Sequence, residues 1–132
     1  MSSIAFDAMV VSSHDPEEGL FLIGFADDPT DPSKYLLLQR SLEPTDQDRD
    51  LGQDTYYLEW CSQEQSVYGG IEEFALGDSV ALIRFAPHAT NALGGLSELV
   101  ISFSLSKSEL ETLDQGLQLV FSGSRCFSRA NA

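Results

Sequence analysis

The sequence predicts an α+β fold: a largely antiparallel sheet of about six to seven strands, with one C-terminal amphipathic helix and a short helix packed on one face. Short segments rich in β-branched and aromatic residues recur as far as Leu105, separated by turn residues. A later segment has leucines at helical spacing instead. Because the chain shows no internal repeat and no linker, we expect one domain over residues 1–132.

Three strands are expected in the N-terminal third of the chain. They are Ile4–Ser13, Leu20–Asp27 and Lys34–Leu42. A short polar turn separates the first two, which favours an antiparallel hairpin. The third has a continuous apolar centre, which predicts burial on both faces in the middle of the sheet, beneath a helix.

A fourth strand is expected over Thr55–Ser62, where Tyr, Trp and Thr favour extended backbone. Alternation places Tyr57, Glu59 and Cys61 on one face of this strand. The following segment, Gln63–Gly70, is interpreted as a loop. Arg40 and Glu59 each lie within an apolar strand pattern, and a structural ion pair between them is the simplest interpretation.

The next segments predict a hairpin, a short helical turn and a last strand. Gly77-Asp78 separates two apolar segments, "IEEFAL" and "SVALIRF", which is typical of a hairpin. Pro87 stands near the start of Ala86–Gly95, and glycine stands near its end, as at the ends of helices. The strand is expected over Glu98–Leu105.

The clearest helix follows Ser106, because Glu109 stands three residues later and completes a capping box. Gly123 supplies a C-terminal stop. Apolar residues recur at helical spacing between these ends. They are Leu110, Leu113, Leu117, Val120 and Phe121. We predict no regular element in the C-terminal tail, where Cys126 is expected to be an exposed or loosely packed thiol.

Composition excludes several classes of protein. Acidic residues outnumber basic ones 21 to 7, and the formal charge is −14. Such a charge repels phosphate groups, so nucleic acid and anionic membranes are not expected as partners. The two cysteines are far apart, which is typical of a reducing compartment. The N-terminus has neither a basic region nor a long apolar one, so we expect a cytoplasmic protein.

The segment Glu43–Asp54 holds five carboxylates in twelve residues. An EF-hand beginning at Asp46 would place Leu51 where glycine is needed and Tyr57 where a bidentate glutamate is needed. A solvated turn is therefore the simplest interpretation, and the acidic face of a binding protein is a second. A cation-binding regulatory module is a third. Its ligands would be Asp46, Asp48, Asp50 and Asp54.

Catalytic signatures are sparse in the sequence. His14 and His88 are not accompanied by a Gly-x-Ser-x-Gly elbow, and no phosphate-binding glycine motif is present. Cysteine and histidine are too scattered for a zinc site. We therefore expect no enzyme activity, no metal site and no cofactor. A small hydrolase that uses one of the two histidines ranks last among the alternatives.

Three short motifs carry a resemblance to a known family. They are "YLLLQR" (Tyr35–Arg40), "DTYYLE" (Asp54–Glu59) and "YGGIE" (Tyr68–Glu72). In this order, and over Leu20–Leu117, the chain resembles the Immunity protein 10 family of bacterial polymorphic toxin systems. The resemblance implies a small cytosolic antidote that binds and blocks a cognate toxin without catalysis.

The charge fits such a role, because many secreted toxins are nucleases with basic clefts and an acidic inhibitor would have a complementary potential. We take the acidic segment as the first candidate surface and the turn after the second strand as the next. Tyrosines beside them could supply affinity. The residues expected to contact the partner are Asp27, Asp28, Asp31, Tyr35, Glu43, Asp46, Asp48, Asp50, Asp54, Tyr56 and Tyr68.

Overall fold

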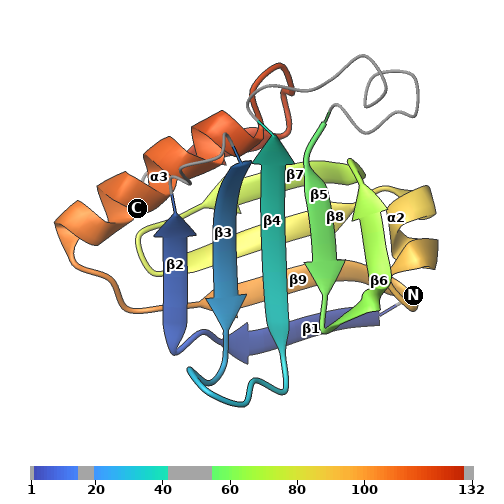
Figure 1. Ribbon diagram of the computed structural model, residues 1–132, viewed down its shortest axis with the longest axis horizontal. Helices are drawn as coiled ribbons and strands as arrows, with labels where there is room; N and C mark the ends of the chain where they lie inside the picture. Colours follow the sequence, from blue (N-terminus) through green and yellow to red (C-terminus); the bar gives the residue numbers. More distant parts are fainter. Residues whose placement is uncertain (1, 15–19, 42–54, 130–132) are drawn as a thin grey trace.

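Two five-stranded sheets face each other in the computed structural model, which describes residues 2–14, 20–41 and 55–129. Their strands run across one another in Figure 1, where one sheet lies in front of the other. The α+β class and the mostly antiparallel pairing agree with the sequence-based prediction. The number of strands was predicted too low, and the single expected sheet is in fact two.

The front sheet, here called sheet B, is antiparallel throughout and follows the order of the chain. Its strands are β2 (Val10–His14), β3 (Leu20–Ala26), β4 (Tyr35–Ser41), β5 (Tyr57–Trp60) and β6 (Ser62–Tyr68). Each strand pairs with the next one along the chain. Sheet B is therefore a meander with β4 at its centre.

The second sheet, sheet A, combines the two ends of the described chain with a central hairpin. In spatial order its strands are β1 (Ser2–Asp7), β9 (Leu96–Ser102), β8 (Val80–Phe85), β7 (Ile71–Leu76) and β10 (Phe127–Arg129). The two edge strands, β1 and β10, each lie parallel to their neighbour, whereas the inner pairs are antiparallel. Gly77-Asp78 lies in the β7–β8 turn, as predicted.

Two helices, α2 (Pro87–Ala92) and α3 (Lys107–Val120), pack at the sides of the sandwich. The predicted capping box is present in α3: Ser106 Oγ accepts from the Glu109 amide, and the Glu109 carboxylate accepts from the Ser106 amide. α3 contacts β2, β3, β4 and β10, and α2 contacts β6 and β9. The outer face of sheet B is uncovered by either helix (Figure 1).

The core lies between the inner faces of the sheets and continues under α3. Its side chains alternate along the strands, as expected for sheets with one buried face. Phe25 of sheet B contacts Phe74 of sheet A, and Phe74 contacts Phe121 after α3. α3 can approach sheet B closely because Gly116 has no side chain: a Cβ there would lie 2.9 Å from the Phe21 ring. One core cluster therefore joins both sheets and the helix.

Four expectations about individual segments were wrong. The strand expected over Ile4–Ser13 is interrupted at Ala8-Met9, and its halves belong to different sheets. The loop expected over Gln63–Gly70 contains most of β6. The C-terminal tail forms β10, and Cys126 before it is buried. Although β4 is central, only one of its faces is fully buried.

Arg40 and Glu59 do not form the expected ion pair, because their side chains lie on opposite faces of sheet B. The Arg40 guanidinium donates 2.8 Å hydrogen bonds to the carbonyls of Val120 and Ser122. Carbonyls at the C-terminal end of a helix carry partial negative charge, so a cation there is stabilising. Arg40 thus attaches β4 to the end of α3.

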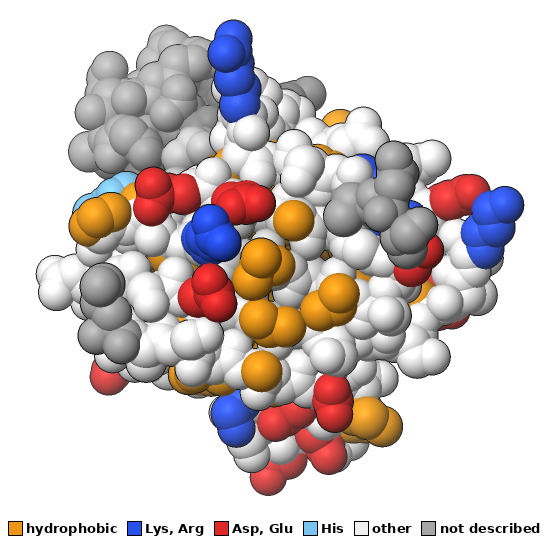
Figure 2. All heavy atoms as spheres, turned by 180° about the vertical axis from the view of Figure 1, so that it is seen from behind, with side chains coloured by type: hydrophobic (Ala, Val, Ile, Leu, Met, Phe, Trp, Pro, Cys, Tyr) orange, Lys and Arg blue, Asp and Glu red, His pale blue; other side chains and the backbone are white. Residues whose placement is uncertain are grey.

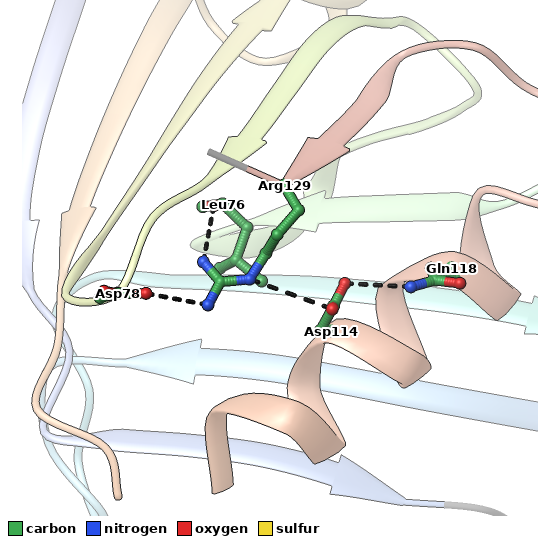
Figure 3. A network of polar contacts seen from close by, with 5 residues as sticks. All are labelled: Leu76, Asp78, Asp114, Gln118 and Arg129. Atoms are coloured by element: carbon green, nitrogen blue, oxygen red, sulfur yellow. Dashed lines mark hydrogen bonds and ion pairs between the residues drawn. The ribbon is translucent and has the colours of Figure 1, made fainter. Parts of the chain in front are cut away.

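A second arginine, Arg129, connects three elements near the C-terminus (Figure 3). It donates to the Leu76 carbonyl at 3.1 Å and to Asp78 Oδ1 at 2.9 Å. Its Nε lies 4.0 Å from a carboxylate oxygen of Asp114 on α3, and Gln118 donates to the other oxygen. These contacts hold the short strand β10 against both β7 and the helix.

Candidate interaction surface

The predicted contact residues fall into three groups. Five of them lie outside the described residues, namely Glu43, Asp46, Asp48, Asp50 and Asp54. Three belong to the β3–β4 loop and three are tyrosines. The last described residue before the acidic segment is Ser41, at one end of β4. The β3–β4 loop joins the other end of this strand. Because β4 has seven residues, roughly 20 Å separate Ser41 from the end of the strand that the β3–β4 loop joins.

The β3–β4 loop is organised by its own carboxylates. Asp28 Oδ1 accepts from the amide and hydroxyl of Thr30, at 2.9 and 3.1 Å, and from the Asp31 amide at 3.0 Å. The two backbone donors lower the pKa of Asp28, which keeps it charged. Asp27 Oδ1 accepts from the Ser33 amide at 2.9 Å. The loop is therefore an ordered turn that presents negative charge.

Acidic side chains gather at the lower end of the molecule in Figure 2, where this loop lies. Asp28 and Asp31 are exposed, and Lys34 is the one basic residue between β3 and β4. The Asp31 side chain makes no hydrogen bond or ion pair with any residue that the structure describes. Its charge is thus available to a partner.

Tyr35 and Tyr57 lie on the outer face of sheet B on either side of Glu59. Both hydroxyls donate to the Glu59 carboxylate, Tyr35 to Oε2 and Tyr57 to Oε1, the latter at 2.8 Å. Glu59 is only 7% exposed although it lies on the outer face. The two phenols therefore shield the carboxylate, and it fixes the orientation of both rings.

Tyr68 is on the same face and is 39% exposed. Its ring and that of Tyr57 form a T-shaped pair, with centroids 5.4 Å apart. Tyr56 differs from these residues, because it is 4% exposed and packs against Phe121. Its hydroxyl accepts a 2.8 Å hydrogen bond from the Ile71 amide, so it connects the two sheets inside the core. Alternation along β5 agrees with this placement.

A groove of about 330 Å³ opens on the same outer face, next to the β3–β4 loop. Gly24 pairs with Ser12 on one side and Leu37 on the other, and its missing side chain leaves the space between them. Most of the lining is apolar. The lining residues are Val10, Ser12, Gly24, Phe25, Ala26, Pro32, Tyr35, Leu36 and Leu37. The groove depends on the register of three strands, so no pattern in the sequence predicts it.

The sequence matches the family model described as Immunity protein 10 over residues 7–111. The chain belongs to the Immunity protein 10 family. The resemblance noted from three motifs is thereby confirmed. Comparisons with curated proteins and with solved structures found no match.

Membership of the Immunity protein 10 family makes this chain an immunity protein of a toxin system, a class that binds a cognate toxin. The matched region contains all of sheet B and ends within α3. It therefore includes the groove, the β3–β4 loop and the tyrosines around Glu59, whereas β10 lies beyond it.

The opposite side of this immunity protein, the outer face of sheet A, is different in character (Figure 2). Strand register places Ala75, Leu82, Val100 and Ala5 in one apolar row across four strands. In the adjacent row Arg84 lies 3.4 Å from Glu73 and 3.5 Å from Glu98. The charges of this row are therefore paired with one another.

Candidates for chemistry in the described part of the protein are the side chains of His88, Cys61 and Cys126. No cluster of three metal-ligating side chains occurs there. His88 is exposed, and burial raises the pKa of the thiols of Cys61 and Cys126, which disfavours the nucleophilic thiolate. Among the described residues, no helix has both the length and the apolar character needed to cross a membrane.

Proposed function

We propose that this protein is a non-catalytic antidote of a polymorphic toxin system that binds its cognate toxin and occludes the toxin's active site. This proposal rests on the family match over residues 7–111. The net charge of −14 supports a basic partner, and a nuclease toxin with a basic substrate cleft has the complementary potential. The chain would act in the cytoplasm as one domain, since a single core joins its two sheets.

The proposed contact surface keeps ten of the eleven residues expected from the sequence. Tyr56 is left out because its side chain is buried and holds the sheets together. The outward-facing tyrosines Tyr35 and Tyr68 and the β3–β4 loop support a surface on the outer face of sheet B, where Tyr35 directly follows the acidic loop. The proposed contact residues are Asp27, Asp28, Asp31, Tyr35, Tyr68, Glu43, Asp46, Asp48, Asp50 and Asp54.

The test is a titration of the purified protein against the activity of its cognate toxin. Occlusion predicts that inhibition is complete at one antidote per toxin and that the toxin is recovered intact when the complex is dissociated. Inhibition at far lower ratios, with a modified or cleaved toxin, would show catalysis instead. Absence of both binding and inhibition would overturn the proposed function itself.

The acidic segment is tested with a matched pair of triple variants. In one, Asp46, Asp48 and Asp50 become Asn; in the other, the exposed acids Glu64, Glu72 and Glu111 become Gln. Both remove three negative charges, so a general effect of net charge is the same in each. A role for the segment predicts weaker binding for the first variant only. Equal affinities would remove the segment from the proposed surface.

A further inference from the structure

We propose that the groove on the outer face of sheet B receives an apolar side chain from a basic segment of the cognate toxin, whose Lys or Arg side chains pair with the adjacent β3–β4 loop. This inference rests on the proposed function. It adds the place of contact and the chemistry of the toxin segment that fits there.

The groove has the size, the apolar walls and the open access that an incoming side chain needs. Its volume of about 330 Å³ is comparable with small binding pockets in proteins, which begin near 300 Å³. Its walls are Val10 on β2, Leu37 on β4 and Pro32 of the loop. No helix covers this face, so a partner can reach the groove directly (Figure 1). An apolar side chain that enters it would exchange water for these apolar walls.

The rim of the groove is acidic, and this charge determines the charge that the partner must have. Pro32 lines the groove, and Asp31 directly precedes it in the chain. Hydrogen bonds to Asp27 and Asp28 hold this turn in place, so the acidic rim is formed before a partner arrives. The loop contains three carboxylates and one ammonium group, that of Lys34, so it has an excess of negative charge beside the apolar groove. A segment with an apolar side chain flanked by basic residues is complementary to both.

Tyr35 has a rigidly held side chain. It lines the groove on the side opposite Val10. Its hydroxyl is held by Glu59, so the ring loses little conformational freedom when a partner packs on it. Fixed aromatic side chains beside a pocket are frequent hot spots of interfaces. The outer face of sheet A lacks this combination, since its charged row is paired internally.

The experiment compares two leucines that occupy equivalent positions. Leu37 on β4 and Leu82 on β8 are both half-buried, outward-facing residues on the central strand of a sheet. We would measure the affinity of an inactivated cognate toxin for the full chain and for Leu37→Gln and Leu82→Gln. The groove predicts that Leu37→Gln weakens binding by about tenfold or more, whereas Leu82→Gln changes it by less than about twofold.

Two further variants separate loss of the groove from loss of the fold. Ala26→Leu fills the groove with apolar volume, and it is expected to weaken binding with an unchanged melting temperature. Asp31→Lys is expected to slow association more than Glu111→Lys, which makes the same change of charge on α3. The proposal is overturned if Ala26→Leu and Asp31→Lys bind the toxin as tightly and as fast as the wild type.

The remaining outcomes are also decisive. If the wild type binds and inhibits the toxin while all groove variants match their controls, the docking site is wrong and the proposed function stands. If the wild type neither binds nor inhibits the toxin, the proposed function fails and the docking site fails with it. If sedimentation shows a wild-type dimer that Leu37→Gln converts to a monomer, the groove is occupied by a second copy of the chain.

Discussion

The hydroxyl of Tyr35 on β4 donates a hydrogen bond to the carboxylate of Glu59 on β5, on a face of sheet B that no helix covers. A buried carboxylate on an outer face is held there by hydrogen bonds rather than by a neighbouring helix. Burial and the contact with Glu59 raise the pKa of Tyr35 to about 12, so its hydroxyl remains a donor at neutral pH. The same bond sets the ring that lines the proposed docking groove.

Tyr35→Phe should lower the stability of the fold. It removes one of the two hydroxyl donors to Glu59, and a buried acceptor left with fewer partners costs about 1–3 kcal/mol in free energy of unfolding. Urea denaturation would measure this loss. Tyr68→Phe is the control, because the Tyr68 hydroxyl bonds to none of the described residues; it should change stability by less than about 0.5 kcal/mol. Equal losses in the two variants would contradict the role of the hydrogen bond.

Alkaline pH should destabilise the protein through Tyr56. Burial raises the pKa of Tyr56 from its ordinary value of 10.0 to about 12. A group whose pKa is higher in the folded state stabilises the fold below its unfolded pKa, and this contribution is lost as pH rises from about 10 to about 12. The loss is on the order of 2 kcal/mol. In urea denaturation at several pH values, Tyr56→Phe should show a smaller decline than the wild type over this range, and parallel curves would contradict the prediction.

Gly70 should tolerate alanine less well than Gly95 does. Both have positive φ, +94° and +99°, so alanine is strained by about 1–2 kcal/mol at either site. At Gly70, however, a Cβ would also lie 2.5 Å from Ala89 Cβ on α2, whereas nothing lies within 4 Å at Gly95. The overlap should add about 1–3 kcal/mol to the cost of Gly70→Ala. Thermal unfolding of the two variants would detect the difference, which should vanish if the β6–β7 turn can move away from α2.

Arg40→Met should destabilise the protein more than Arg84→Met. Arg40 makes two charged hydrogen bonds to the end of α3, and each such bond contributes about 1.5–3 kcal/mol. Arg84 pairs with Glu73 and Glu98 across exposed side chains, where ion pairs contribute about 0–1 kcal/mol. Chemical denaturation gives both values. A larger loss for Arg84→Met would show that the ion pairs on sheet A matter more than the attachment of α3.

Toxin association should slow as salt rises, if acidic side chains steer the encounter. Exposed charges are screened over about 8 Å at physiological ionic strength and over about 3 Å at 1 M. The association rate, followed by stopped-flow fluorescence, should therefore fall by about tenfold or more between low salt and 1 M. A rate that is independent of salt would remove steering from the mechanism and leave the apolar contact in the groove as the source of affinity.

Local patterns predicted local features well. The capping box of Ser106 and Glu109 and the hairpin at Gly77-Asp78 depend on neighbours within a few residues, and both are present. The break at Ala8-Met9 could not be seen, because neither residue is a turn former and the apolar pattern continues across it. The reason for the break is tertiary: Ala8 is buried where the chain passes from sheet A to sheet B.

The architecture depends on long-range contacts that composition does not encode. An alternating strand indicates one buried face, but it does not indicate whether a helix or a second sheet covers that face, and so one sheet was expected. β10 is three residues long and is recognisable only from its pairing with β7. The groove was missed for a similar reason, since Gly24 creates a hollow only when Ser12 and Leu37 lie beside it.

The order of strands also has a consequence for synthesis on the ribosome. Sheet B is assembled from neighbours in the chain, and all its strands have been made once Tyr68 is translated. Sheet A must wait, because β1 pairs with β9, and Ile4 faces Leu99. The nascent chain therefore carries β1 without its partner while most of the protein is made, and contacts so distant in sequence form slowly. Sheet B, whose outer face carries the groove, would therefore fold first. At that stage sheet A does not yet cover the inner face of sheet B.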